Sequence, residues 1–253
     1  MIARTGALAQ YTLLVEAVNT LGDNDFALPT RLGEWRVAEL VAHLGATIEA
    51  VTRALAKPPP ERADTDLLGY LGAMRSYAPA VAERATDLAR DASPDALRTA
   101  FASSVAAATE ALAGADDDRL VLLRLGAVPL RDLLITRCVE GVVHGLDLRA
   151  ATGVPATLDP AALKVVVRAF ASLLGRVAPG RSVEVRVPGH VAVQCVEGPR
   201  HTRGTPPNVV EAYAEAFVEL VAGRLSWTDA TANGAARASG ERADLSAYLP
   251  LIG

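Results

Sequence analysis

The sequence predicts an α plus α+β protein, with an all-helical part over residues 1–153 and a smaller α+β part over residues 154–253. In the first part, apolar residues recur every three or four positions, which is the period of amphipathic helices. In the second part, residues 182–189 and 190–198 alternate in polarity, which is typical of two strands joined by a tight turn. The chain is 51% hydrophobic but only 4% aromatic, so small and aliphatic side chains form most of its core.

The first part is expected to contain five helical segments, over residues 7–21, 32–55, 66–90, 93–114 and 129–153. Pro79 should kink or divide the third segment, because proline cannot donate the backbone hydrogen bond of a helix interior. Ser93 and Pro94 provide a cap and a first turn for the fourth segment, and Pro129 opens the fifth. Residues 120–128 are short and apolar and are expected to be extended.

The second part is expected to begin with a helix over residues 160–177, ahead of the two strands. A basic, proline-rich loop follows at residues 200–209. Beyond this loop the sequence predicts a helix over residues 209–222, a third strand or extended segment over 230–239 and a short helix over 244–249.

Composition and charge argue against several classes of protein. The net charge of −4 and the scattered lysines and arginines argue against a nucleic-acid partner. We expect no membrane span, because no apolar run approaches about 18 residues, and no signal peptide, because the N-terminus lacks a compact apolar core. Two cysteines are too few for a disulfide framework, so a reducing cytoplasm is the expected location.

Glu140 and His144 stand four residues apart in the last helix of the first part. That spacing places both side chains on one face, where a carboxylate and an imidazole can hold one divalent cation. Arg137 and Asp147 continue this polar stripe, and the opposite face of the helix is apolar. The same residues also fit a solvated face with spaced ion pairs, each worth about 0.2–0.5 kcal/mol. The spacing alone therefore leaves both interpretations open.

Three further residues are relevant to a metal site at this stripe: two glycines of the same helix and a histidine of another. Gly141 and Gly145 flank the pair, and each costs about 1 kcal/mol relative to alanine in a helix, so close packing or ligand access is expected there. His43 lies beside the apolar stripe of the helix predicted over residues 32–55. Taken alone, it is typical of a partly exposed helix histidine.

Two longer stretches resemble the signatures of a known family. Residues 29–44, PTRLGEWRVAELVAHL, carry a Thr, a Gly and a Trp ahead of a helix with Ala-His-Leu, and residues 140–153, EGVVHGLDLRAATG, fit the pattern E-x-x-x-H-G-x-D-L-x-x-A-T-G. In this order they resemble the mycothiol-dependent maleylpyruvate isomerase-like branch of the DinB superfamily, over the whole helical part. The resemblance implies a four-helix bundle that binds zinc or another divalent metal through His43, Glu140 and His144. Asp147 is then expected to orient one histidine.

The second part resembles a bacterial sterol-carrier-protein-like domain, through residues 183–211 and 223–250. Such domains place helices over a sheet and often enclose an apolar cavity. The chain departs from the catalytic relatives in two places. It has Leu251, Ile252 and Gly253 where they commonly have a Gly-Arg pair, and it has HGLDL in place of the commoner HGWDL. The resemblance therefore does not by itself identify maleylpyruvate as the substrate.

The family resemblance implies an enzyme in which a metal activates mycothiol, a low-molecular-weight thiol of actinobacteria, for isomerisation of a small electrophile or thiol transfer to it. A metal-bound thiol loses its proton at neutral pH and becomes a nucleophile. In the basic loop, Arg203 and His201 are the candidate catalytic residues, and Arg200 and Arg203 the candidate cofactor-binding residues, through a carboxylate of thiol or substrate. These residues equally fit a loop held by its own salt bridges.

A second class of function also fits the sequence. The sterol-carrier-like part could hold a lipid or another apolar ligand without catalysis, and the bundle would then carry a structural or vestigial metal site. A metal with an open coordination position separates the two functions, because the enzyme needs one and a lipid carrier does not.

Overall fold

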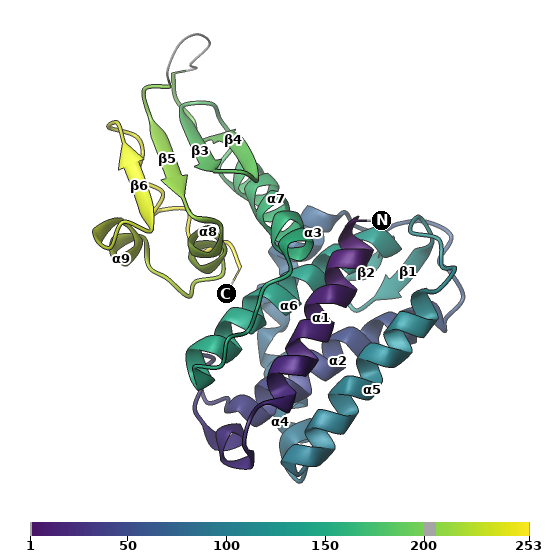
Figure 1. Cartoon of the computed structure of the whole chain (residues 1–253). Helices are drawn as coiled ribbons and strands as arrows, with labels where there is room; N and C mark the ends of the chain where they lie inside the picture. Colours follow the sequence, from purple (N-terminus) through teal and green to yellow (C-terminus); the bar gives the residue numbers. More distant parts are fainter. Residues whose placement is uncertain (1, 200–205, 253) are drawn as a thin grey trace. The chain divides into compact units, whose positions relative to one another are not determined.

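Four long helices form the core of the N-terminal unit in the computed structural model, which describes residues 2–199 and 206–252 (Figure 1). α1 (Ile2–Asn19) and α2 (Val37–Leu55) each pack against both α5 (Pro94–Leu112) and α6 (Leu130–Thr152). This arrangement confirms the predicted four-helix bundle. The chain divides into two compact units, residues 1–162 and 163–253.

Shorter elements cover the bundle. A 3₁₀ helix, η1 (Asp23–Ala27), follows α1, and the segment between α2 and α5 holds α3 (Leu67–Ala73), the 3₁₀ helix η2 (Met74–Tyr77) and α4 (Ala78–Ala89), which packs on α2. Pro79 lies in the first turn of α4, so the predicted division of this segment is found. The predicted extended segment is an antiparallel hairpin of β1 (Leu120–Leu123) and β2 (Gly126–Pro129) that leads directly into α6.

The start of α2 is set by capping rather than by its apolar stripe. The sequence predicts a helix from residue 32, but α2 begins at Val37, because the Glu39 carboxylate accepts the Arg36 backbone N–H at 2.9 Å. The residues before it form a tight loop in which the Thr30 backbone N–H donates to the Trp35 carbonyl at 2.9 Å. α6 ends as predicted at Gly153, which adopts the left-handed conformation at φ +71°.

The C-terminal unit is a four-stranded sheet with helices. After α7 (Pro160–Val177), β3 (Val183–Val187) and β4 (Val191–Cys195) form the predicted antiparallel pair. β5 (Val209–Ala212) joins β3 in parallel and β6 (Ala236–Ser239) joins β5 antiparallel, giving the order β4-β3-β5-β6. α8 (Ala214–Val221) and α9 (Trp227–Ala232) lie between β5 and β6 in the chain, so this unit is α+β as predicted (Figure 1).

Three predictions for the C-terminal unit are wrong in detail. Residues 209–212 are a strand and not the start of a helix, because both edges of β5 find hydrogen-bonding partners in β3 and β6. Of the segment predicted as extended over residues 230–239, residues 236–239 form the strand β6, but residues 230–232 end the helix α9, which the Ser226 side chain caps by accepting the Asp229 backbone N–H at 3.0 Å. Residues 244–249 form a turn and not a helix, since the Asp244 carboxylate takes the Ser246 backbone N–H at 2.8 Å.

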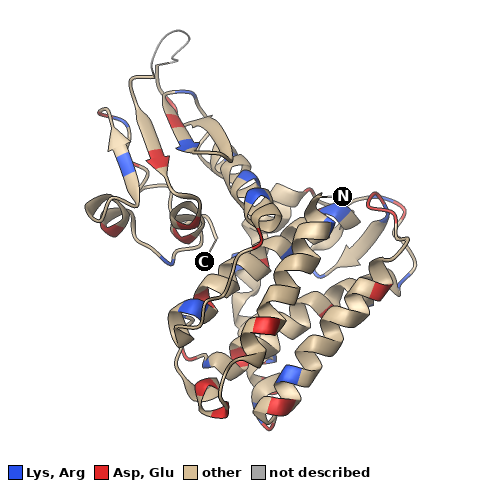
Figure 2. Cartoon of the chain, viewed as in Figure 1, with Lys and Arg blue, Asp and Glu red and all other residues tan. Residues whose placement is uncertain are grey.

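Charged residues of both signs are interspersed along the bundle helices in the described residues, as Figure 2 shows. Within the same residues, every helix is too short or too polar to cross a membrane.

Candidate metal centre

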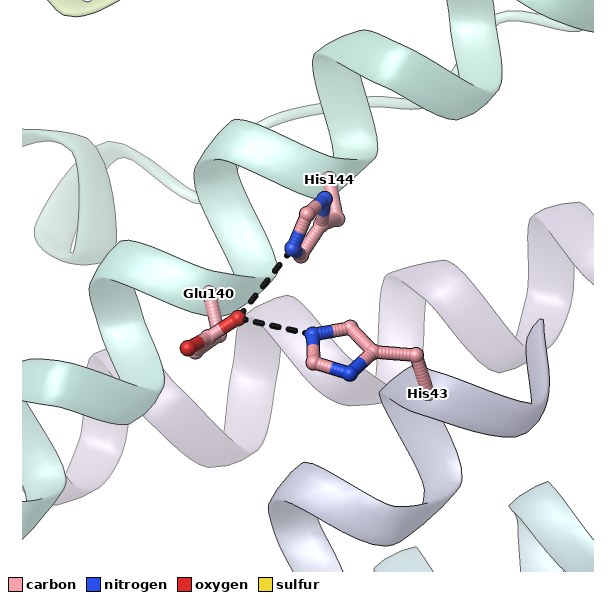
Figure 3. A group of neighbouring side chains, drawn as sticks. All are labelled: His43, Glu140 and His144. Carbon is pink, nitrogen blue, oxygen red and sulfur yellow. Dashed lines mark hydrogen bonds and ion pairs between the residues drawn. The ribbon is translucent and has the colours of Figure 1, made fainter. Parts of the chain in front are cut away.

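Two helices of the bundle bring the predicted ligands together. His43 projects from α2, and Glu140 and His144 project from α6 one turn apart (Figure 3). Nε2 of His43 lies 3.0 Å from Oε2 of Glu140, and Nε2 of His144 lies 3.2 Å from the same oxygen. The imidazole rings meet edge to face, with 4.8 Å between their centroids.

This geometry suits a divalent metal. The three ligand atoms all lie within 4.8 Å of one another. Ligand atoms about 2.0–2.1 Å from a tetrahedral ion are roughly 3.3 Å apart, which is close to the two nitrogen–oxygen distances observed here. Two imidazoles and one carboxylate are a ligand set that zinc accepts, with a further coordination position left for a water or a substrate.

Asp147 extends the centre away from the three ligands. Its carboxylate is fully buried and lies 2.9 Å from Nδ1 of His144 and 2.6 Å from Nε of Arg31. A hydrogen bond at Nδ1 directs Nε2 of His144 toward Glu140, as the outer partner of a metal-ligating histidine does. The tight loop before α2 thus contributes Arg31 to the centre, and sequence reasoning missed this role. In the sequence, Arg31 stood out only as a charged residue within the first family signature, residues 29–44.

Burial rules out the solvated-face interpretation of the polar stripe. Arg137 and Glu140 are only 6% and 9% exposed, and Asp147 is fully buried. His43 is also buried, at 7% exposure, which corrects the expectation of a partly exposed histidine. Both faces of α6 are therefore enclosed by the bundle, and its polar stripe is an internal one.

The electrostatics of the three ligands suit a cation. Burial disfavours ionisation of Glu140, but hydrogen bonds from His144 and His43 outweigh it and hold the pKa of this carboxyl well below its usual range. Burial lowers the pKa of His43, so its ring is neutral at pH 7. Burial acts in the same direction on His144, but Asp147 and Glu140 outweigh it and raise the pKa of His144 to about 9. Without a metal, the ring of His144 is therefore protonated at pH 7, and it lies between the carboxylates of Glu140 and Asp147.

A cavity of about 240 Å³ adjoins the centre, with His43 and Glu140 in its wall. Its other residues come from α2, α3, η2, α4, α6 and the turn between β1 and β2. Four of them are arginines: Arg53, Arg84, Arg124 and Arg137. The sequence showed these charges but gave no reason to group them, since they lie on four separate segments.

The predicted residues of the basic loop, Arg200, His201 and Arg203, lie outside the residues that the structure describes. Their catalytic and cofactor-binding roles stay predictions. The structure brings together His43, Glu140, His144 and Asp147, and metal binding by the first three also stays a prediction.

The structure thus defines a protein of two units. The first is a helical bundle with a candidate metal centre of two histidines and one glutamate, and the second is α+β. Residues 8–149 match the model of the family described as mycothiol maleylpyruvate isomerase N-terminal domain, and the chain belongs to that family. Residues 159–251 match the model described as bacterial SCP ortholog.

Solved structures support the same fold. The mycothiol-dependent maleylpyruvate isomerase superposes with a TM-score of 0.60 at 19% identity, over 89% of each chain. A histidine-to-alanine mutant of that isomerase gives a TM-score of 0.63 at 18% identity, over 88% of this chain and 89% of the other. No curated protein matches the sequence.

Proposed function

We propose that this protein is a metal-dependent enzyme that uses mycothiol to isomerise a small electrophilic substrate, or to transfer the thiol to it. The observation that carries the proposal is the convergence of His43, Glu140 and His144 beside a cavity. The family supports the choice of thiol. A divalent metal, with zinc as the first choice, would act as a Lewis acid that lowers the pKa of a thiol placed on it. A carrier of apolar ligands, the alternative function, needs no such centre.

The chain's own residues prepare the centre for this chemistry. Glu140 supplies the negative charge that holds a cation, and the neutral ring of His43 would bind the cation through Nε2 in place of the hydrogen bond to Glu140. Asp147 and Arg31 fix the ring of His144 in place, so the ligands need little rearrangement. The side chains of His43, Glu140 and His144 are only 8–12% exposed, and burial strengthens the electrostatic interactions between them.

The chain's own thiols are poor nucleophiles, which favours an external one. Cys138 and Cys195 are both buried. Burial raises the pKa of the Cys138 thiol to about 12 and that of Cys195 to about 11. Because the thiolate is the reactive form, neither side chain can serve at neutral pH. Use of mycothiol would also place the protein in the reducing cytoplasm of an actinobacterium.

Elemental analysis combined with a thiol-dependent assay tests the proposal. We expect about one equivalent of metal in the metal-replete protein, and mycothiol-dependent conversion of small electrophiles that a chelator abolishes. His43→Ala should lose metal and activity together, whereas His190→Ala, which changes a histidine of the C-terminal unit, should retain both. Metal-free wild-type protein, or equal metal content in His43→Ala, would contradict the proposed centre.

A further inference from the structure

The two histidines of the candidate metal centre are held in different ways. Nδ1 of His144 lies 2.9 Å from the buried carboxylate of Asp147, so a hydrogen bond fixes the orientation of this ring. His43 makes its hydrogen bond through Nε2, to Glu140 at 3.0 Å (Figure 3), and its Nδ1 atom has no hydrogen-bond partner among the described residues. A histidine that binds a metal usually has such a partner at its second ring nitrogen. Another contact is therefore needed to orient the ring of His43.

That contact comes from Trp35, near the end of the tight loop before α2. The centroids of the Trp35 and His43 rings are 5.2 Å apart, and their planes are inclined by 49°. The indole is half-buried, although Glu34 and Arg36 on either side of it are exposed. Two aromatic rings whose centroids are about 4.5–7 Å apart attract each other beyond the effect of area burial. The indole therefore restricts the rotation of the His43 ring.

The conformation of the tight loop fixes the position of Trp35. The Trp35 carbonyl accepts both the Thr30 backbone N–H at 2.9 Å and the Thr30 hydroxyl at 2.8 Å. Pro29 and Arg36, at the two ends of the loop, pair as an isolated antiparallel bridge. The loop thus has a conformation set by its own hydrogen bonds, and this conformation presents the indole to His43.

The same loop reaches the second histidine through another side chain. Nε of Arg31 lies 2.6 Å from Oδ1 of Asp147, and Oδ2 of Asp147 lies 2.9 Å from Nδ1 of His144. One short loop therefore contacts His43 directly and His144 through one intervening carboxylate. These histidines belong to α2 and α6, which are separate helices of the bundle.

We propose that the tight loop before α2 positions both histidines for the metal, with Trp35 as the positioning residue for His43. A ring that packing already restricts loses less freedom when it binds a metal, so the affinity for the metal is higher. Because both histidines depend on one loop, metal binding and docking of the loop are linked, and each favours the other. This inference rests on the metal of the proposed function, but metal affinity can be measured without turnover.

The zinc affinity of the full chain, measured by competition with a chromophoric chelator, tests the role of Trp35. Trp35→Leu should weaken zinc binding about three- to tenfold, because the His43 ring then loses its freedom only on binding. Trp35→Phe retains an aromatic ring and should recover most of that affinity. Trp227→Leu changes the other tryptophan of the chain, at the start of α9, and should leave the affinity unchanged.

Thermal unfolding of the metal-free variants separates positioning from a structural role. Trp35→Leu protein that is less stable than wild type but binds zinc equally tightly would make Trp35 a structural residue only and would overturn the inference.

The fluorescence of Trp35 gives a second test, in which the loop stays intact. In Trp227→Phe, Trp35 is the one remaining tryptophan. Zinc should change its emission, because the neighbouring His43 ring exchanges its hydrogen bond with Glu140 for the metal. In Trp35→Phe, the emission of Trp227 should not respond to zinc. Unchanged Trp35 emission while zinc binds would overturn the inference, even if Trp35→Leu does not fold.

A double variant tests whether the loop acts as one unit. Arg31→Gln should also weaken zinc binding, whereas Arg36→Gln, at an exposed arginine of the same loop, should not. Arg31→Gln combined with Trp35→Leu should weaken zinc binding by less than the product of the two single effects, because the first change already releases the loop. Fully multiplicative effects would show two independent contacts and overturn the shared role of the loop.

The outcome also separates this inference from the proposed function. Wild-type protein that binds no zinc would contradict the proposed function, and this inference with it. Wild-type protein that binds zinc no more tightly than Trp35→Leu and Arg31→Gln would contradict this inference alone.

Discussion

Asp147 is the residue that connects the first family signature to the second. Its buried carboxylate lies between Arg31, in the loop before α2, and the Nδ1 atom of His144 on α6. Arg31 and Asp147 are 116 residues apart in the chain. One side chain therefore fixes both the orientation of a candidate ligand and the position of the loop that precedes α2.

Replacing Asp147 with asparagine should weaken metal binding about 10- to 100-fold, because the amide removes the charge that orients and polarises His144. Competition with a chromophoric chelator measures the affinity, and thermal unfolding of the metal-free protein reports the structural cost separately. Asp132→Asn, in the first turn of the same helix, is the matched control and should leave affinity unchanged. An unaltered affinity in Asp147→Asn would show that Asp147 only stabilises the fold.

At the scale of elements, α6 must approach α1 closely to bring its ligands inside the bundle. A Cβ atom at Gly141 would lie 2.9 Å from Cγ of Gln10 and 3.1 Å from Cε2 of Tyr11, both on α1. The space available at Gly141 is therefore only that of a hydrogen atom. This close packing, which the sequence left as one of two explanations for the glycine, sets the distance between the two helices.

Gly141→Ala should destabilise the protein by about 1–3 kcal/mol, because the methyl group overpacks the interface between α1 and α6. Gly72→Ala is the matched control on α3, where an added Cβ meets nothing within 4 Å. That change should be neutral or stabilise the chain by up to about 1 kcal/mol through helix propensity. Urea unfolding of both variants measures the difference, and equal free energies of unfolding would show that the interface yields easily.

At the scale of the whole molecule, the candidate metal centre and its pocket lie within the N-terminal unit. The basic loop belongs to the C-terminal unit. Its residues Arg200, His201 and Arg203 lie outside the residues that the structure describes. Any catalytic role for this unit is therefore a prediction from sequence, and it needs a test that leaves the metal centre untouched.

Arg203→Ala should weaken mycothiol binding roughly ten- to a hundredfold or more, the effect of losing a charge-assisted contact of about 1.5–3 kcal/mol. Metal content should stay unchanged, since all three candidate ligands belong to the bundle. Calorimetry with mycothiol, paired with elemental analysis, measures both. Arg181→Ala, an exposed arginine before β3, is the control. Unchanged mycothiol affinity in Arg203→Ala would leave the loop with a structural role.

The sequence by itself determined the elements whose signals are local. Helical periodicity located the bundle helices, alternation located β3 and β4, and the spacing of Glu140 and His144 placed both on one face of α6. Each of these depends on residues close together in the chain. The strand β5 was missed because residues 209–212 fit a helix as well, and the distant strands β3 and β6 decide between the two.

Only the tertiary structure decided which polar residues are internal. Arg137, Glu140 and Asp147 form a stripe that local periodicity cannot distinguish from a solvated face, and the packing of α1 and α2 against α6 buries it. The ion pair of Arg31 with Asp147 and the grouping of Arg124 with Arg137 likewise join segments far apart in the chain. A local pattern fixes the direction of a side chain relative to its own helix, whereas its burial and partners depend on how separate helices pack.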